Sequence, residues 1–103
     1  MIAHTAADVT VPPNTETEIL SWTSDGVQEL VGFLASGTYS AEYRLYVGDD
    51  PAPWYVYQTS PGNRTAYVAD RAKVVPTGKI VSLRVYHEST EGPQRFRGTL
   101  LGG

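Results

Sequence analysis

Hydrophobic and polar residues alternate along several short segments of the chain, which is the pattern of β-strands with one buried face. The clearest segment covers residues 38–47. One side of it carries Tyr39, Ala41, Tyr43, Leu45 and Val47, and the other carries Ser40, Glu42, Arg44 and Tyr46. Residues 79–88 and 94–101 repeat the pattern, with Val81, Leu83 and Val85 and with Phe96 and Leu100 on the apolar side. We predict that these apolar sides form the core.

Eight strand-like segments, separated by turns about every ten residues, cover the chain. They are residues 7–11, 15–23, 28–35, 38–47, 53–59, 65–75, 79–88 and 94–101. The connecting segments contain Gly, Pro, Asn or Asp, which suit turns because they tolerate a positive φ or fix φ near about −65°. We therefore predict an all-β fold, a single-domain antiparallel β-sandwich over residues 7–103. It is jelly-roll-like with about eight strands and follows a flexible leader over residues 1–6.

Two segments allow a helical alternative. In residues 25–34, Val27, Leu30, Val31 and Leu34 have helical spacing, but Gly32 and Phe33 interrupt the pattern, so a strand is favoured. A short helical turn around residues 69–73 stays open beside the strand interpretation.

The composition is that of a small globular domain. The 103 residues are 41% hydrophobic and 18% charged, enough to bury a core without a disulfide or a metal ion. No segment approaches the roughly 18 apolar residues that cross a bilayer, and the start shows no signal peptide. We expect a protein made in a cytoplasm and not associated with a membrane, and the absence of cysteine fits that compartment.

Charge is unevenly distributed along the chain. The net charge of −3 argues against nucleic acid as the main partner, because such proteins usually carry a basic patch. Residues 1–50 carry eight acids and one base, a net of −7, whereas residues 51–103 carry seven bases and three acids, a net of +4. These charges either pair across strands within one molecule or form complementary faces between subunits.

The sequence offers no convincing catalytic or cofactor site. It has two histidines: His4 lies in the expected leader, and His87, near the end of a strand, is interpreted as structural. Asp49 and Asp50 lack the spacing of a calcium loop, and Asn63-Arg64-Thr65, a glycosylation pattern, is interpreted as the end of a turn. We expect no enzyme, cofactor or metal; a small enzyme is the least favoured hypothesis.

An interface is the better candidate for a functional site. Trp54, Tyr55 and Tyr57 lie close together, and strand alternation places adjacent residues on opposite faces, so we expect Trp54 or Tyr55 to lie outside the core unless another chain covers it. The alternative is that both faces of the sheet are covered here within the monomer. Arg95 and Arg97 flank Phe96. With Arg84 they either form a basic strip for an acidic partner or belong to an ordinary solvated face.

Four stretches resemble small jelly-roll virion proteins of tailed bacteriophages. They are residues 36–47 (SGTYSAEYRLYV), 57–64 (YQTSPGNR), 78–87 (GKIVSLRVYH) and 96–102 (FRGTLLG), and the likeness covers residues 30–103 as a pattern of strands and turns. The resemblance implies trimers that decorate or cement capsids, or that lie in tails and fibres, without catalytic residues.

Two functions follow as hypotheses. The first is a non-enzymatic virion structural protein, foremost a capsid decoration protein, that forms a homotrimer and binds the major capsid protein or other virion subunits. The alternative is a carbohydrate-binding or host-recognition β-sandwich module that uses exposed aromatic residues to hold a glycan.

Overall fold

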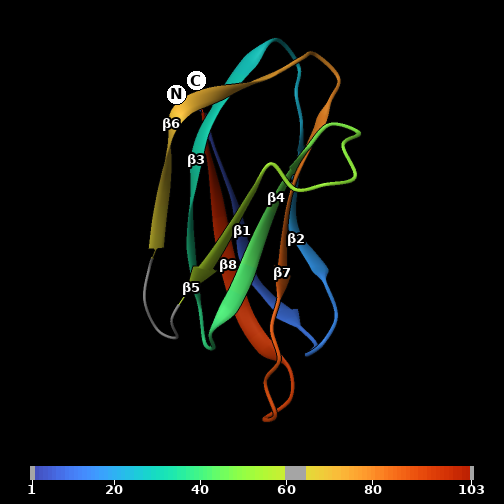
Figure 1. Cartoon of the computed structure of the whole chain (residues 1–103), viewed down its shortest axis with the longest axis vertical. Helices are drawn as coiled ribbons and strands as arrows, with labels where there is room; N and C mark the ends of the chain where they lie inside the picture. Colours follow the sequence, from blue (N-terminus) through green and yellow to red (C-terminus); the bar gives the residue numbers. More distant parts are fainter. Residues whose placement is uncertain (1, 60–64, 103) are drawn as a thin grey trace.

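Eight strands in two sheets make up the structure. The computed structural model describes the backbone of residues 2–59 and 65–102, and the side chains of residues 9–27, 29–58 and 73–102. The strands are β1 (Ile2–Val11), β2 (Thr17–Thr23), β3 (Gln28–Gly37), β4 (Ala41–Val47), β5 (Tyr55–Thr59), β6 (Thr65–Val75), β7 (Ile80–Tyr86) and β8 (Gln94–Gly102) (Figure 1). The described backbone contains no helix, and hence none that is long and apolar enough to span a membrane. The predicted all-β fold is confirmed.

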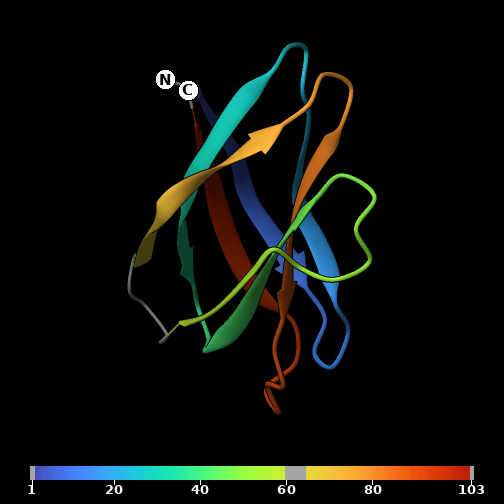
Figure 2. The same cartoon turned by 45° about the horizontal axis from the view of Figure 1, so that its top comes forward.

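The strand order is that of a jelly roll. One sheet has the order β1-β8-β3-β6 and the other β2-β7-β4-β5, and every pairing is antiparallel. The chain crosses between the sheets after most strands, so each sheet is built from segments far apart in sequence, as in the two Greek keys of a jelly roll. Figure 2 shows the two sheets facing each other, with the two chain ends side by side.

A β-bulge explains the helix-like spacing in residues 25–34. The register of β3 against β8 shifts between Leu30, opposite Gly102, and Gly32, opposite Leu101, which leaves Val31 as an extra residue of β3. The register against β6 shifts at the same point, but there the additional residues, 69–72, lie on β6. Leu30 and Phe33 can therefore both face the core although they are three positions apart. The strand interpretation is confirmed, and the alternative of a helical turn at residues 69–73 is wrong, since that segment lies within β6.

The first strand begins earlier than expected. Residues 2–6, expected as a flexible leader, form the first half of β1, and their backbone pairs with Gly98–Gly102 of β8. The sheet therefore includes residues 2–6, which were expected to precede it. Without residues 2–6, the backbone groups of β8 on this side would lack hydrogen-bond partners in the sheet. The first half of β1 supplies those partners.

The core lies between the sheets at the positions that alternation predicts. Among its buried members are Tyr43, Leu45, Val81, Leu83, Val85, Phe96 and Leu100. The Tyr43 ring lies 6.1 Å from the ring of Phe33 and 6.1 Å from that of Phe96, so aromatic residues of both sheets meet at the centre. Gly98 lies against this core, and a Cβ atom at this position would lie 2.5 Å from the Leu83 side chain, which would have to shift.

Candidate functional site

A polar network covers the outer face of the β2-β7-β4-β5 sheet. Alternation aims the residues between core positions of β4 and β7 outward, and the strand register then sets Arg44 opposite Arg84 and Glu42 opposite Tyr86. We call this surface the polar face; it consists of Glu16, Glu18, Glu42, Arg44, Tyr46, Ser82, Arg84 and Tyr86. Its side chains engage one another rather than projecting separately into solvent.

Glu16 joins the two opposed arginines. Two cations directly opposite on neighbouring strands repel each other. Glu16, in the turn before β2, places its Oε2 3.5 Å from Arg44 Nη1 and its Oε1 3.9 Å from Arg84 Nη1. The Tyr46 hydroxyl donates to Glu16 Oε1 at 2.7 Å, and this bond, aided by burial, raises the pKa of Tyr46. One carboxylate thus offsets the repulsion between two strands.

Stacking and hydrogen bonds hold the arginines in place. The guanidinium of Arg44 lies 5.1 Å from the centre of the Tyr86 ring, and that of Arg84 lies 4.2 Å from the centre of the Tyr46 ring. Arg44 Nε donates to Glu42 Oε1 at 2.7 Å, and this bond raises the pKa of Arg44. The polar face is therefore preorganised, which lowers the entropy lost when a partner binds.

Ser82 is buried beneath the polar face. Its hydroxyl donates to Glu18 Oε1 at 2.6 Å and accepts from Arg84 Nε at 3.1 Å. The hydroxyl both donates and accepts a hydrogen bond, so its burial leaves no polar group without a partner.

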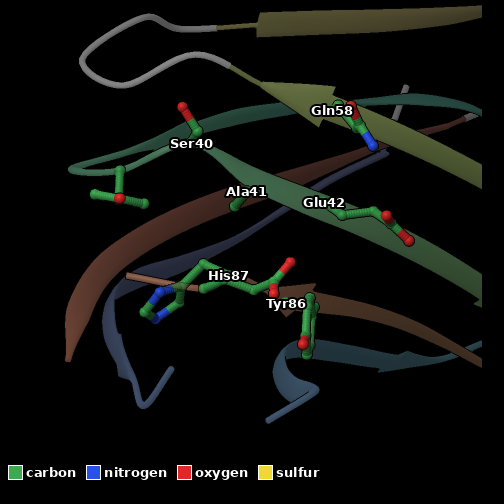
Figure 3. Close-up of a pocket in the computed structure, with 8 residues that line it drawn as sticks. Ser40, Ala41, Glu42, Gln58, Tyr86 and His87 are labelled. Atoms are coloured by element: carbon green, nitrogen blue, oxygen red, sulfur yellow. The ribbon is translucent and has the colours of Figure 1, made fainter. Parts of the chain in front are cut away.

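A hollow of about 310 Å³ opens at one end of the polar face. Tyr86 of β7, Glu42 of β4 and Gln58 of β5 are cross-strand neighbours and form a row along it (Figure 3). Its remaining lining residues are Tyr39, Ser40, Ala41, His87 and Glu88. The sequence indicated the outward position of Glu42 but not this row, because the register between strands depends on long-range pairing.

His87 links the two sheets instead of facing the hollow with a free nitrogen. The residue is 2% exposed, and its Nε2 lies 2.7 Å from the Val11 carbonyl oxygen, to which it donates. Its Nδ1 accepts from the Ser89 amide at 3.2 Å. Backbone groups thus occupy both ring nitrogens, and neither is positioned to take a proton from a substrate.

The predicted aromatic interface residues lie at the β5 edge. Trp54 precedes the strand, and its amide donates to the Leu45 carbonyl at 2.7 Å; the Tyr55 and Tyr57 rings are stacked 6.1 Å apart. All three are half-buried and pack against the core. Neither Trp54 nor Tyr55 belongs to the fully buried core, and Trp54 lies before the strand, so the alternation of β5 does not apply to it. The outward residue is Val56, which is 43% exposed.

The predicted arginines do not form one strip. Arg95 and Arg97 are exposed on β8, whereas Arg84 lies on β7 in the opposite sheet and belongs to the polar face. The proposed grouping of Arg84 with the other two is therefore wrong, since the outer faces of the two sheets point in opposite directions.

The Asp49–Asp50 turn is held by local contacts. Lys79 Nζ lies 2.8 Å from Asp49 Oδ2 and lowers the pKa of Asp49, while Asp50 Oδ1 accepts from the Ala52 amide at 3.0 Å. Within the side chains that the structure describes, no group of three or more metal-binding residues occurs. Asn63 and Arg64 of the glycosylation pattern lie outside the described residues.

Part of the charge separation is neutralised within the molecule. The Lys79–Asp49 and Arg84–Glu16 contacts each join an acid of residues 1–50 to a base of residues 51–103. This agrees with the interpretation that charges pair across strands. The jelly-roll order is the reason, because it interleaves the two halves of the chain.

Comparisons with known proteins support the fold alone. No protein-family profile matches the chain, and no curated protein sequence matches it. A de novo designed double-stranded β-helix, solved by NMR, is similar with a TM-score of 0.52 and 16% identity, covering 95% of this chain and 99% of the designed one. A crystal structure of PirA is similar with a TM-score of 0.56 and 14% identity, covering 95% of this chain and 91% of PirA. The chain thus has a two-sheet β-sandwich fold that both natural and designed proteins adopt.

Proposed function

We propose that the protein is a non-enzymatic virion structural protein of a tailed bacteriophage. In this role it is a capsid decoration protein that forms a homotrimer and binds other virion subunits. The resemblance of residues 30–103 to such proteins supports the proposal. So does the fold, because jelly rolls are widely used in viral capsids.

The observation that carries the proposal is the edge strand β5. It is the last strand of its sheet and pairs with β4 alone among the described strands (Figure 1). Edge strands offer backbone hydrogen-bonding groups to another chain, and large aromatic residues are enriched at protein interfaces. β5 combines both features, since exposed Val56 lies between the half-buried Tyr55 and Tyr57.

A second observation gives the partner contact an orientation. Arg95 and Arg97 keep exposed positive charge on β8, away from the polar face. In a cyclic trimer one patch meets a different patch of the neighbour, so this basic strand suits a heterologous contact with an acidic surface of the next subunit.

Sedimentation equilibrium tests the association. We expect the wild type to show three times the mass of one 11.2 kDa chain at micromolar concentration. Val56→Lys places a charge in the β5 contact and should yield monomers, because burying an unpaired charge is costly. Val27→Lys is the matched control, since Val27 is 72% exposed and lies outside β5.

The outcomes separate two parts of the proposal. A wild-type mass of one chain across micromolar concentrations would contradict self-association outside the virion. An oligomer that survives Val56→Lys as well as Val27→Lys would leave self-association standing and show that β5 is not its interface.

A further inference from the structure

The hollow beside Tyr86 has the size and construction of a small-ligand site. Its volume of about 310 Å³ is at the lower end of the range of ligand pockets, roughly 300–1,000 Å³. Three neighbouring strands supply Tyr86, Glu42 and Gln58, and the labelled side chains in Figure 3 show them on one side of the sheet. Strands fix side chains more firmly than loops do, so the row is a rigid platform.

The lining offers both hydrogen-bond acceptors and donors. Glu42 Oε1 accepts a hydrogen bond from Arg44 Nε, whereas Glu42 Oε2 has no hydrogen-bond partner among the described side chains. The carboxylate of Glu88 and the amide of Gln58 have no hydrogen-bond partner among those side chains, and Ser40 adds a hydroxyl. Two aromatic rings, Tyr39 and Tyr86, add apolar surface with a polar tip.

The charges of the lining select against ions of either sign. Glu42 and Glu88 disfavour an anion. A cation would gain from these carboxylates and from the ring of Tyr86, but the guanidinium of Arg44 already lies over that ring and on Glu42. A second cation there would be repelled by Arg44. The lining suits a neutral ligand with many hydroxyl groups.

We propose that this hollow binds a sugar residue of a glycan. Sugar hydroxyls donate to the Glu42 and Glu88 carboxylates and accept from the Gln58 amide, while the apolar C–H face of the sugar ring packs on Tyr39. This site goes beyond the assembly role and uses none of the aromatic residues at the β5 edge that the sequence had suggested for glycan binding.

Amide NMR titration of the ¹⁵N-labelled full chain tests the site. The probes are glucose, galactose, mannose and N-acetylglucosamine, with tetramethylammonium and inorganic phosphate as charged comparisons. We expect at least one sugar to cause saturable shifts confined to residues 39–42, 58 and 86–88, and neither ion to do so. Glu88→Ala and Gln58→Ala should each weaken sugar affinity about tenfold.

Glu29→Ala is the matched control, because Glu29 is an exposed carboxylate on β3 in the other sheet. It should leave sugar affinity unchanged. The proposal is overturned if no sugar gives localised, saturable shifts, or if tetramethylammonium gives them in place of the sugars. It is also overturned if Glu29→Ala weakens binding as much as Glu88→Ala does.

Discussion

The Phe96 ring lies between the sheets, 6.1 Å from the ring of Tyr43 and 5.3 Å from that of His87. Its neighbours on the strand, Arg95 and Arg97, are exposed. Three consecutive residues of β8 thus differ completely in environment, because successive side chains point to opposite faces of a sheet. Single substitutions on this strand should therefore have very different effects on stability.

Phe96→Ala should lower the free energy of unfolding by about 3–5 kcal/mol, because it removes buried contacts and leaves a cavity. Arg95→Ala, one residue away, should change it by less than about 0.5 kcal/mol. Urea titrations followed by circular dichroism measure both. Equal losses in the two variants would mean that the inner and outer faces of β8 are assigned incorrectly.

Because Tyr43 is buried, we expect the free energy of unfolding to fall in alkaline solution. Burial raises the pKa of Tyr43, whose hydroxyl donates to the Ser36 carbonyl at 3.1 Å. The unfolded chain releases this proton near about pH 10, while the folded protein keeps it. The stabilising contribution is thus complete below that pH and is lost as the pH rises toward the folded-state pKa.

Unfolding free energies measured from about pH 8 to pH 11 check this linkage. We expect Tyr43→Phe to lose less stability over this interval than the wild type does. Parallel curves for the two proteins would rule out Tyr43 as a source of the alkaline effect.

At the scale of the elements, the pairing of β4 with β7 is stabilised by a residue from outside both strands. Their opposed arginines, Arg44 and Arg84, repel each other unless Glu16 lies between them. Glu16 belongs to neither strand but to the turn before β2. The turn between β1 and β2, which joins the two sheets, therefore also stabilises the pairing of β4 with β7.

Glu16→Ala should lower the free energy of unfolding by about 1 kcal/mol at low salt, a modest value because these groups are partly exposed. The loss should shrink at high salt, which screens the repulsion between Arg44 and Arg84. Glu91→Ala, an exposed carboxylate in the β7–β8 turn, is the control and should show neither effect. A loss independent of salt would contradict the electrostatic explanation.

At the scale of the whole molecule, the two ends of the chain pair with each other. Ile2 lies opposite Gly102 and Ala6 opposite Gly98, so β1 covers one side of β8. Figure 1 shows the two ends side by side. A segment that resembles a tail in the sequence is thereby part of the sandwich.

A variant that lacks residues 1–6 should be less stable by on the order of 2–4 kcal/mol, since each backbone hydrogen bond contributes about 0.5–1.5 kcal/mol. It should also aggregate more readily, because the deletion exposes an edge of β8. Denaturant unfolding and light scattering measure the two effects. If the variant matched the full chain in both, residues 2–6 would be a dispensable leader after all.

The amino-acid sequence by itself determined the strands, their turns and their buried faces. Alternation in residues 38–47, 79–88 and 94–101 identified core residues such as Leu83 and Phe96, and Gly and Pro marked the turns. These properties are local, because the period of two and the preferred φ of a turn residue are set within a few positions of the chain. They sufficed for the sandwich and for the strand count.

Only the tertiary structure decided which strands are neighbours and in which register. Glu16 reaches Arg84 across 68 positions of sequence, and the row of Tyr86, Glu42 and Gln58 combines three strands. The bulge at Val31 and the pairing of Ile2 with Gly102 likewise depend on partners that lie far away in sequence. Such contacts are selected by the packing of the whole sandwich, whereas alternation within one strand carries no information about its partner.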